Sequence, residues 1–233
     1  MDAKNTAVAT RLGAYTAIGG SACAITGATL GILSGTDIDL SLVSNDMATY
    51  LTLAGENTRL LVANLTIWIV MVLLLSIAAT AMTSLCKRRP LMAQLARFCY
   101  WVGAPLVIGA YVAWLAVVLQ VAPDTSPAAV VVAKAMGWFA SRADWIATIL
   151  IIGIGPTFIA MAGRNEWVPR WLFIWSIVTA VAGLLNAVAM LTGGSGLGSY
   201  GFAIIPVGVG WMIAAGVVLF RRIDTTQEGE DAA

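Results

Sequence analysis

The chain has 233 residues, of which 60% are hydrophobic and 11% are charged, and its formal net charge is +1. Because soluble domains carry about 25% charged residues, this composition excludes an ordinary soluble domain, and the balanced charge gives no reason to expect a nucleic-acid partner. The chain has no histidine, which excludes a Ser-His-Asp triad, haem ligation by histidine and a histidine pH switch.

Six apolar runs are each long enough to cross a bilayer. A hydrocarbon core of about 30 Å needs roughly 20 apolar residues in a helix, and backbone exposed to lipid must be helical to satisfy its hydrogen bonds. The predicted spans are residues 12–33, 60–85, 98–122, 145–162, 171–191 and 201–220. The sequence therefore predicts an all-α, polytopic transmembrane domain over residues 1–222, followed by a disordered acidic tail at 223–233.

The first span is expected to stay in the mature protein. It follows a polar N-terminal segment, it is too long for a signal-peptide core, and no A-x-A-like cleavage site follows it. The next segment, residues 34–59, carries Asp37, Asp39, Asp46 and Glu56. Its last part could extend the second span outward, with Ser44 or Asn45 as the cap. The acidic spacing does not fit an EF-hand, so no metal site is expected.

A second long connection covers residues 123–144. Ser126 and Pro127 are typical of an N-cap and a first helical position. Residues 128–140 are nearly all apolar but too few to span the membrane. This pattern predicts a short helix lying at the outer interface, with Lys134 extending toward water.

The last two spans are separated by glycines rather than by charges. No charged residue occurs between Trp171 and Phe220, and the glycine-rich stretch 192–199 divides this run. The stretch also matches short protease and dinucleotide strings, but without their structural context, so a flexible outer turn between two helices is predicted.

Lysine and arginine counts predict the orientation. With the N-terminus inside, ten basic residues lie on the cytoplasmic side and three lie outside, namely Arg59, Lys134 and Arg142. This bias predicts an inner (plasma) membrane protein with both termini cytoplasmic. The densest basic cluster either fixes this topology or binds anionic lipid head groups, and it consists of Lys87, Arg88, Arg89 and Arg97.

A few polar and aromatic side chains enter the spans. Asn64, Gln120, Asp144 and Asn186 all lie toward the predicted outer side. They either bond between helices or line a pocket that opens outward. Pockets for apolar ligands are walled by aromatic groups, and the deeper tryptophans include Trp68, Trp114 and Trp211.

Small residues and prolines describe how the helices pack. A seam of small residues with a G-x-x-x-G pair, Gly27 and Gly31, runs along the first span. It predicts close packing within the chain, with homodimerisation as the alternative. Pro105, Pro156 and Pro206 lie inside three spans, where they bend helices. The bends either favour a cavity or a hinge or are the ordinary kinks of membrane helices.

The stretch Trp167-Val-Pro-Arg-Trp-Leu-Phe-Ile-Trp-Ser-Ile, followed by a small-residue helix, resembles an uncharacterised family of bacterial six-helix membrane proteins. The resemblance covers residues 145–222 and implies no established activity.

Function remains open between two main hypotheses. The first is a non-enzymatic accessory subunit or binder of lipid or another apolar ligand, with the bilayer and a possible homo-oligomer or larger complex as partners. The second is a transporter or channel for a neutral or weakly polar solute. No cofactor is expected. An enzyme comes third, because the spans carry no nucleophile–base pair and no metal cluster.

Overall fold

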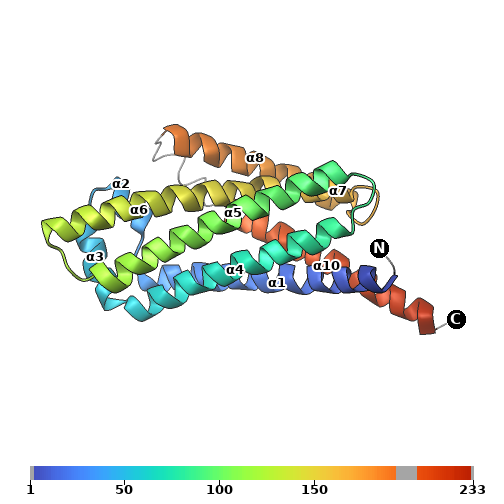
Figure 1. Ribbon diagram of the computed structural model, residues 1–233, viewed down its shortest axis with the longest axis horizontal. Helices are drawn as coiled ribbons and strands as arrows, with labels where there is room; N and C mark the ends of the chain where they lie inside the picture. The colour runs from blue at the N-terminus through green and yellow to red at the C-terminus, as the bar shows by residue number, and fades with distance from the viewer. Residues whose placement is uncertain (1–2, 193–203, 232–233) are drawn as a thin grey trace.

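In a computed structural model, the described residues, 3–192 and 204–231, are almost entirely helical, and no strand occurs among them (Figure 1). Six helical segments are long and apolar enough to cross a membrane, which confirms the predicted all-α, multi-pass membrane fold. These segments are Lys4–Ser34, Thr58–Ser84, Pro90–Val121, Pro127–Gly163, Arg170–Met190 and Ile204–Ile223.

The helices form one bundle with two different ends. Both termini and the loops joining α4 (Thr58–Ser84) to α5 (Pro90–Ala116) and α7 (Gly155–Gly163) to α8 (Arg170–Thr192) lie at one end, which we call the terminal end (Figure 1). The short helices α2 (Ile38–Val43) and α3 (Met47–Glu56) lie at the opposite end, which we call the cap end.

The first helix, α1 (Ala3–Ser34), packs along α4 through its small residues. A Cβ atom added at Gly27 would lie 2.9 Å from Cε2 of Trp68, and one at Gly31 would lie 3.4 Å from Nδ2 of Asn64. Small residues permit such close approach of two helix backbones. The seam of small residues therefore packs within the chain, as its first interpretation predicts.

The predicted interfacial helix at residues 128–140 is wrong. These residues form the outer part of α6 (Pro127–Thr148), which continues through the π-helical segment η2 (Ile149–Ile154) into α7. The whole segment Pro127–Gly163 has 37 residues. Its outer part is covered by protein, because a Cβ atom at Gly137 would lie 3.3 Å from side-chain atoms of Ile38 and Leu42.

The cap end also differs from the sequence prediction in its details. Asp37 caps α2 and Asp46 caps α3, so neither Ser44 nor Asn45 is the cap. The helix α3 ends before Asn57, where a new helix begins, and so it is not an extension of α4. Lys134 donates to Oδ1 of Asn45 at 2.6 Å instead of extending freely toward water.

At the C-terminal side, α10 (Ile204–Asp231) continues as a helix past the predicted boundary. The disordered acidic tail at residues 223–233 stays a prediction. Residues 232–233 lie outside the described residues, as does most of the glycine-rich stretch 192–199.

The segment η2 marks the tightest packing of the bundle. Gly153 approaches α8 so closely that a Cβ atom there would lie 2.9 Å from Cα of Gly183. The hydroxyl of Thr179 donates to the Gly153 carbonyl at 2.9 Å. A Cβ atom at Gly208 of α10 would lie 1.9 Å from Cγ2 of Ile152. Glycine at these positions lets three helices meet around one π-helical turn, and such turns are frequent at functional sites.

Candidate functional site

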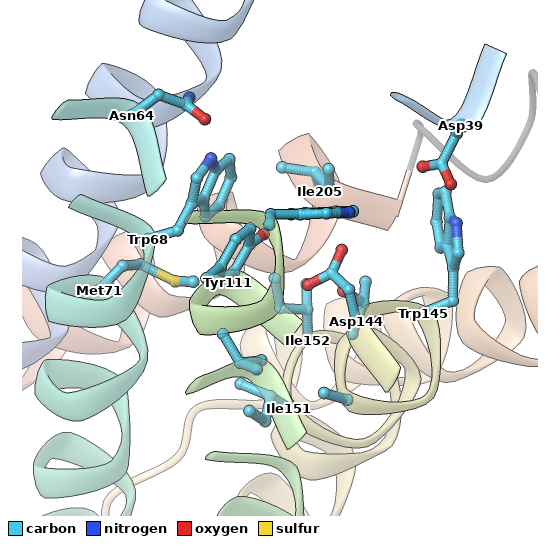
Figure 2. A pocket seen from close by; sticks show the side chains of 14 residues that line it. Asp39, Asn64, Trp68, Met71, Tyr111, Asp144, Trp145, Ile151, Ile152 and Ile205 are labelled. Carbon is cyan, nitrogen blue, oxygen red and sulfur yellow. The ribbon is translucent and has the colours of Figure 1, made fainter. Parts of the chain in front are cut away.

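A cavity of about 160 Å³ lies in the half of the bundle toward the cap end, between α4, α5, α6 and η2 (Figure 2). Ile205 of α10 and Asp39 of α2 complete its wall. Its lining is formed by Asp39, Asn64, Trp68, Met71, Val107, Tyr111, Trp114, Asp144, Trp145, Ala147, Thr148, Ile151, Ile152 and Ile205. The cavity thus combines mainly apolar walls with a few polar groups, the usual character of a small-molecule site.

Aromatic rings from two helices form one side of the cavity. Trp68 of α4 lies parallel to Tyr111 of α5, with ring centroids 6.2 Å apart and planes 8° apart. Tyr111 in turn contacts Trp114, with centroids 5.1 Å apart. Because Tyr111 and Trp114 are three residues apart on one helix, they project from the same face. The helix spacing therefore builds a continuous aromatic wall.

Two carboxyl groups lie on the opposite side. Asp144 comes from the middle of the long helix Pro127–Gly163, and the hydroxyl of Tyr111 is its side-chain hydrogen-bond partner (Figure 2). Asp39 comes from α2. Its carboxyl group accepts hydrogen bonds from Ser141 and Trp145 and interacts electrostatically with the positive charge of Arg142. Burial raises the pKa of Asp39 above its ordinary value, and the hydrogen bond from Ser141 opposes this rise.

The remaining polar groups are used differently. The Asn64 amide donates to the Gly27 carbonyl, which ties α4 to α1. The indole N–H of Trp114 is buried, with the side chain only 8% exposed, and it has no hydrogen-bond partner among the described residues. Since buried polar groups are nearly always paired, this donor at the cavity wall is the least satisfied group of the site.

The structure brings together part of the predicted ligand site. Asn64, Trp68, Trp114 and Asp144 all line the cavity. Asp144, which the sequence places just before a span, lies inside a continuous helix and faces the bundle interior.

The other predicted residues lie elsewhere. Gln120 is exposed on the π-helical segment η1 (Val117–Val121). Trp211 is fully buried and donates to the Leu172 carbonyl at 2.9 Å, so it packs α10 against α8. Asn186 is buried in α8, but it does not line this cavity.

The sequence prediction also missed several residues that line the cavity. Asp39 is hidden in sequence because an acidic residue in an outer loop is usually solvated. Tyr111 could have been found, since it lies three residues before Trp114 and therefore on the same helical face. Trp145 is the first residue of a predicted span, a position that is typical of the membrane interface rather than of a pocket, and Thr148 carries no sequence signal of a ligand site.

The basic cluster at the terminal end is held by specific contacts. The backbone N–H groups of Lys87 and Arg88 donate to the Glu166 carboxylate at 3.0 and 2.9 Å. Arg89 donates to the Met161 carbonyl at 3.2 Å, and Nε of Arg97 donates to the Thr83 hydroxyl at 2.8 Å. We call the Glu166 contacts with residues 87 and 88 the Glu166 bridge. Two of the four cationic side chains are thus bonded within the protein.

A second cavity, of about 340 Å³, lies beside this bridge and is basic. It is lined by Arg164, Asn165, Val168, Arg170, Phe173 and Ile174. The guanidinium of Arg164 stacks over the Phe173 ring, 4.8 Å from its centroid. The two ends of the bundle therefore carry hollows of opposite charge.

Comparison with known proteins yields no family model, curated protein or solved structure that matches the chain. The resemblance of residues 145–222 to a bacterial six-helix family stays a prediction.

Proposed function

We propose that this membrane protein is non-enzymatic and binds a small, mainly apolar molecule in the cavity near the cap end. The observation that carries the proposal is the unpartnered indole N–H of Trp114 in the wall of an aromatic-lined cavity. Leaving a buried donor unpaired costs about 1–3 kcal/mol. A ligand with one acceptor atom would satisfy this donor and fill the space beside Trp68 and Tyr111.

The cavity size favours a small molecule over a whole lipid. Its volume of about 160 Å³ equals that of roughly five water molecules at about 30 Å³ each. An acyl chain would exceed this space. Of the two ligands that the sequence suggests, lipid or another apolar molecule, the second therefore fits better.

A neutral alcohol probe tests the proposal. We expect 3,3-dimethylbutan-1-ol, which has an apolar body and one hydroxyl, to give saturation-transfer NMR signals with the protein in nanodiscs. Val107 lines the cavity and is 3% exposed, so Val107→Phe should fill the space and remove most of this signal. Val102 is an exposed valine on the same helix, and Val102→Phe serves as the matched control. Equal signals from both variants would overturn the proposal.

Transport of a neutral solute, the alternative function, has weaker support. It rests on a continuous polar path, yet Gln120 is exposed and Asn186 lies outside the cavity. The expectation that Asn186 and Asn64 line one pocket is wrong. Pro156, two residues after the end of η2, is one feature that favours a moving helix.

We further propose that the terminal end is cytoplasmic and that the protein resides in the inner membrane, because the basic residues concentrate at that end. Native Cys86 is a poor reporter of sidedness, since burial raises the pKa of its thiol to about 11. In a cysteine-free background, a cysteine at exposed Ser44 should react with an impermeant maleimide in intact cells, whereas one at exposed Arg88 should not. The reverse labelling pattern would contradict this orientation.

The accessory role and the homo-oligomer stay predictions. The small-residue face of α1 is covered by α4 of the same chain, so a second copy would have to use another surface.

A further inference from the structure

We propose that the occupant of the cavity near the cap end is a small organic cation, with an ammonium group next to Asp144 and an apolar body against Trp68, Tyr111 and Trp114. This inference rests on the proposed function, because it names the chemical class of the ligand that the same cavity would bind.

The two carboxyl groups of the cavity differ in their partners. Asp39 accepts hydrogen bonds from Ser141 and Trp145 and lies in the field of Arg142. Among the described residues, Asp144 has only the Tyr111 hydroxyl as a side-chain hydrogen-bond partner. None of the described residues that line the cavity is a lysine or an arginine. Asp144 is therefore the carboxyl group whose charge lacks a counter-charge in this site.

The nearest basic residue on the same helix does not supply that counter-charge. Arg142 is two residues before Asp144, and residues at this spacing project from different faces of a helix. The guanidinium of Arg142 lies over the Trp138 ring, 4.8 Å from its centroid. A carboxylate inside a membrane helix usually pairs with a cation or marks a ligand site. The missing partner of Asp144 is thus best supplied from outside the chain.

The aromatic wall of the cavity also favours a cation. The faces of Trp68 and Tyr111 and the indole of Trp114 border the same space as Asp144. Aromatic rings attract ammonium groups through their quadrupole, and cages of such rings bind quaternary ammonium ligands. The unpartnered N–H of Trp114, in a side chain 8% exposed, adds a donor for an acceptor oxygen on the ligand. An ammonium group with a nearby hydroxyl satisfies every unpaired group of the site.

Two isosteric probes separate charge from shape. Choline carries a quaternary nitrogen where 3,3-dimethylbutan-1-ol carries a carbon, and the two molecules otherwise share size and hydroxyl. We expect the protein in nanodiscs of neutral lipid to bind choline about tenfold or more tightly than the alcohol, since one ion pair with cation–π contacts supplies a factor of this size. Isothermal titration calorimetry and saturation-transfer NMR would measure both affinities.

Matched carboxyl variants assign the effect to one residue. Asp144→Asn should remove the preference for choline over the alcohol. Asp39→Asn should keep most of the preference, because Asp39 is already paired by Ser141 and Trp145. The wild-type comparison needs no variant, so poor folding of Asp144→Asn would not prevent the test.

The possible outcomes separate this inference from the proposed function. The alcohol and choline could bind equally tightly, with Val107→Phe removing the binding. This result would overturn the cation inference and keep the proposed function. Absence of binding for both probes would overturn both. A choline preference that Asp144→Asn leaves intact would also overturn the inference, since the charge would then be recognised elsewhere.

Discussion

The two ends of the bundle handle charge in opposite ways. At the terminal end, basic side chains are numerous and mostly exposed, and the loops are held by the Glu166 bridge and by backbone contacts. At the cap end, two carboxyl groups are drawn into an aromatic cavity, and one of them has a single hydroxyl as its side-chain partner. The number of charges thus predicts the sidedness of the protein, whereas the burial of a few charges locates its candidate site.

The largest expected effect tests how tightly the terminal end is packed. A Cβ atom at Gly163 would lie 2.6 Å from Nε1 of Trp167 and 2.7 Å from Cγ2 of Val168. Gly163→Ala should therefore lower the free energy of unfolding by about 2 kcal/mol, because added atoms in a packed region force neighbours to move. Thermal unfolding in detergent would measure the change.

Gly137→Ala at the cap end is the matched control. There the nearest atoms would be 3.3 Å away, at the flexible ends of Ile38 and Leu42. Its effect should stay below about 0.5 kcal/mol, since alanine also favours a helix over glycine. Similar losses for both variants would show that the two ends do not differ in packing.

The next prediction concerns the Glu166 bridge. Glu166→Gln should destabilise the protein by about 1 kcal/mol, because the amide can no longer accept charge-assisted hydrogen bonds from both Lys87 N and Arg88 N. Solvent exposure of the bridge keeps the loss below that of a buried pair. Glu56→Gln, at an exposed position of the cap end, should have no measurable effect. Chemical unfolding of both variants would decide this, and equal effects would contradict the bridge.

Two asparagines provide a smaller comparison. Asn64→Leu should cost about 0.6 kcal/mol, a typical value for one hydrogen bond between membrane helices, because Asn64 donates to the Gly27 carbonyl. Asn186→Leu should cost less, since Nδ2 of Asn186 has no partner among the described residues. Steric trapping or thermal unfolding would rank the two variants. A larger loss for Asn186→Leu would mean that its amide is bonded in the membrane.

The smallest expected effect is a pH dependence at the cap end. Burial raises the pKa of Asp39 above 3.8 in the folded protein, so folding favours its protonated form. The stability contributed by this group is complete below 3.8 and is lost as the pH rises through the raised pKa. Asp39→Asn should therefore flatten the dependence of the melting temperature on pH in this acidic range. An unchanged profile would show that Asp39 titrates normally.

The spans were predictable because their length and apolar content depend little on neighbours. The continuity of α6 was not predictable in this way. Lys134, Arg142 and Asp144 break the apolar run, but Asn45, Asp39 and Tyr111 partner them in three dimensions. Their partners come from segments distant in sequence, so no local pattern reveals that the helix continues.

The sequence also could not predict the direction in which each polar side chain points. Depth along a span placed Gln120 and Asn186 near Asn64, but depth does not say which way a residue points around its helix. The segment η2 adds to this difficulty, because bonds from i to i+5 hold one residue more than an α-helical turn. Each residue turns a helix by about 100°. The extra residue in η2 therefore rotates the side chains that follow it relative to the faces that a regular α-helix counted from Asp144 would give them.

The continuous helical segment Pro127–Gly163 joins the cap end of the bundle to the terminal end. Its 37 residues measure roughly 55 Å at about 1.5 Å per residue, nearly twice the hydrocarbon thickness. This segment carries Asp144 in the cavity. The carbonyl of its last residue, Gly163, accepts hydrogen bonds from the backbone N–H groups of Glu166, Trp167 and Val168. The segment therefore connects the cavity to the loop whose Glu166 accepts hydrogen bonds from Lys87 and Arg88.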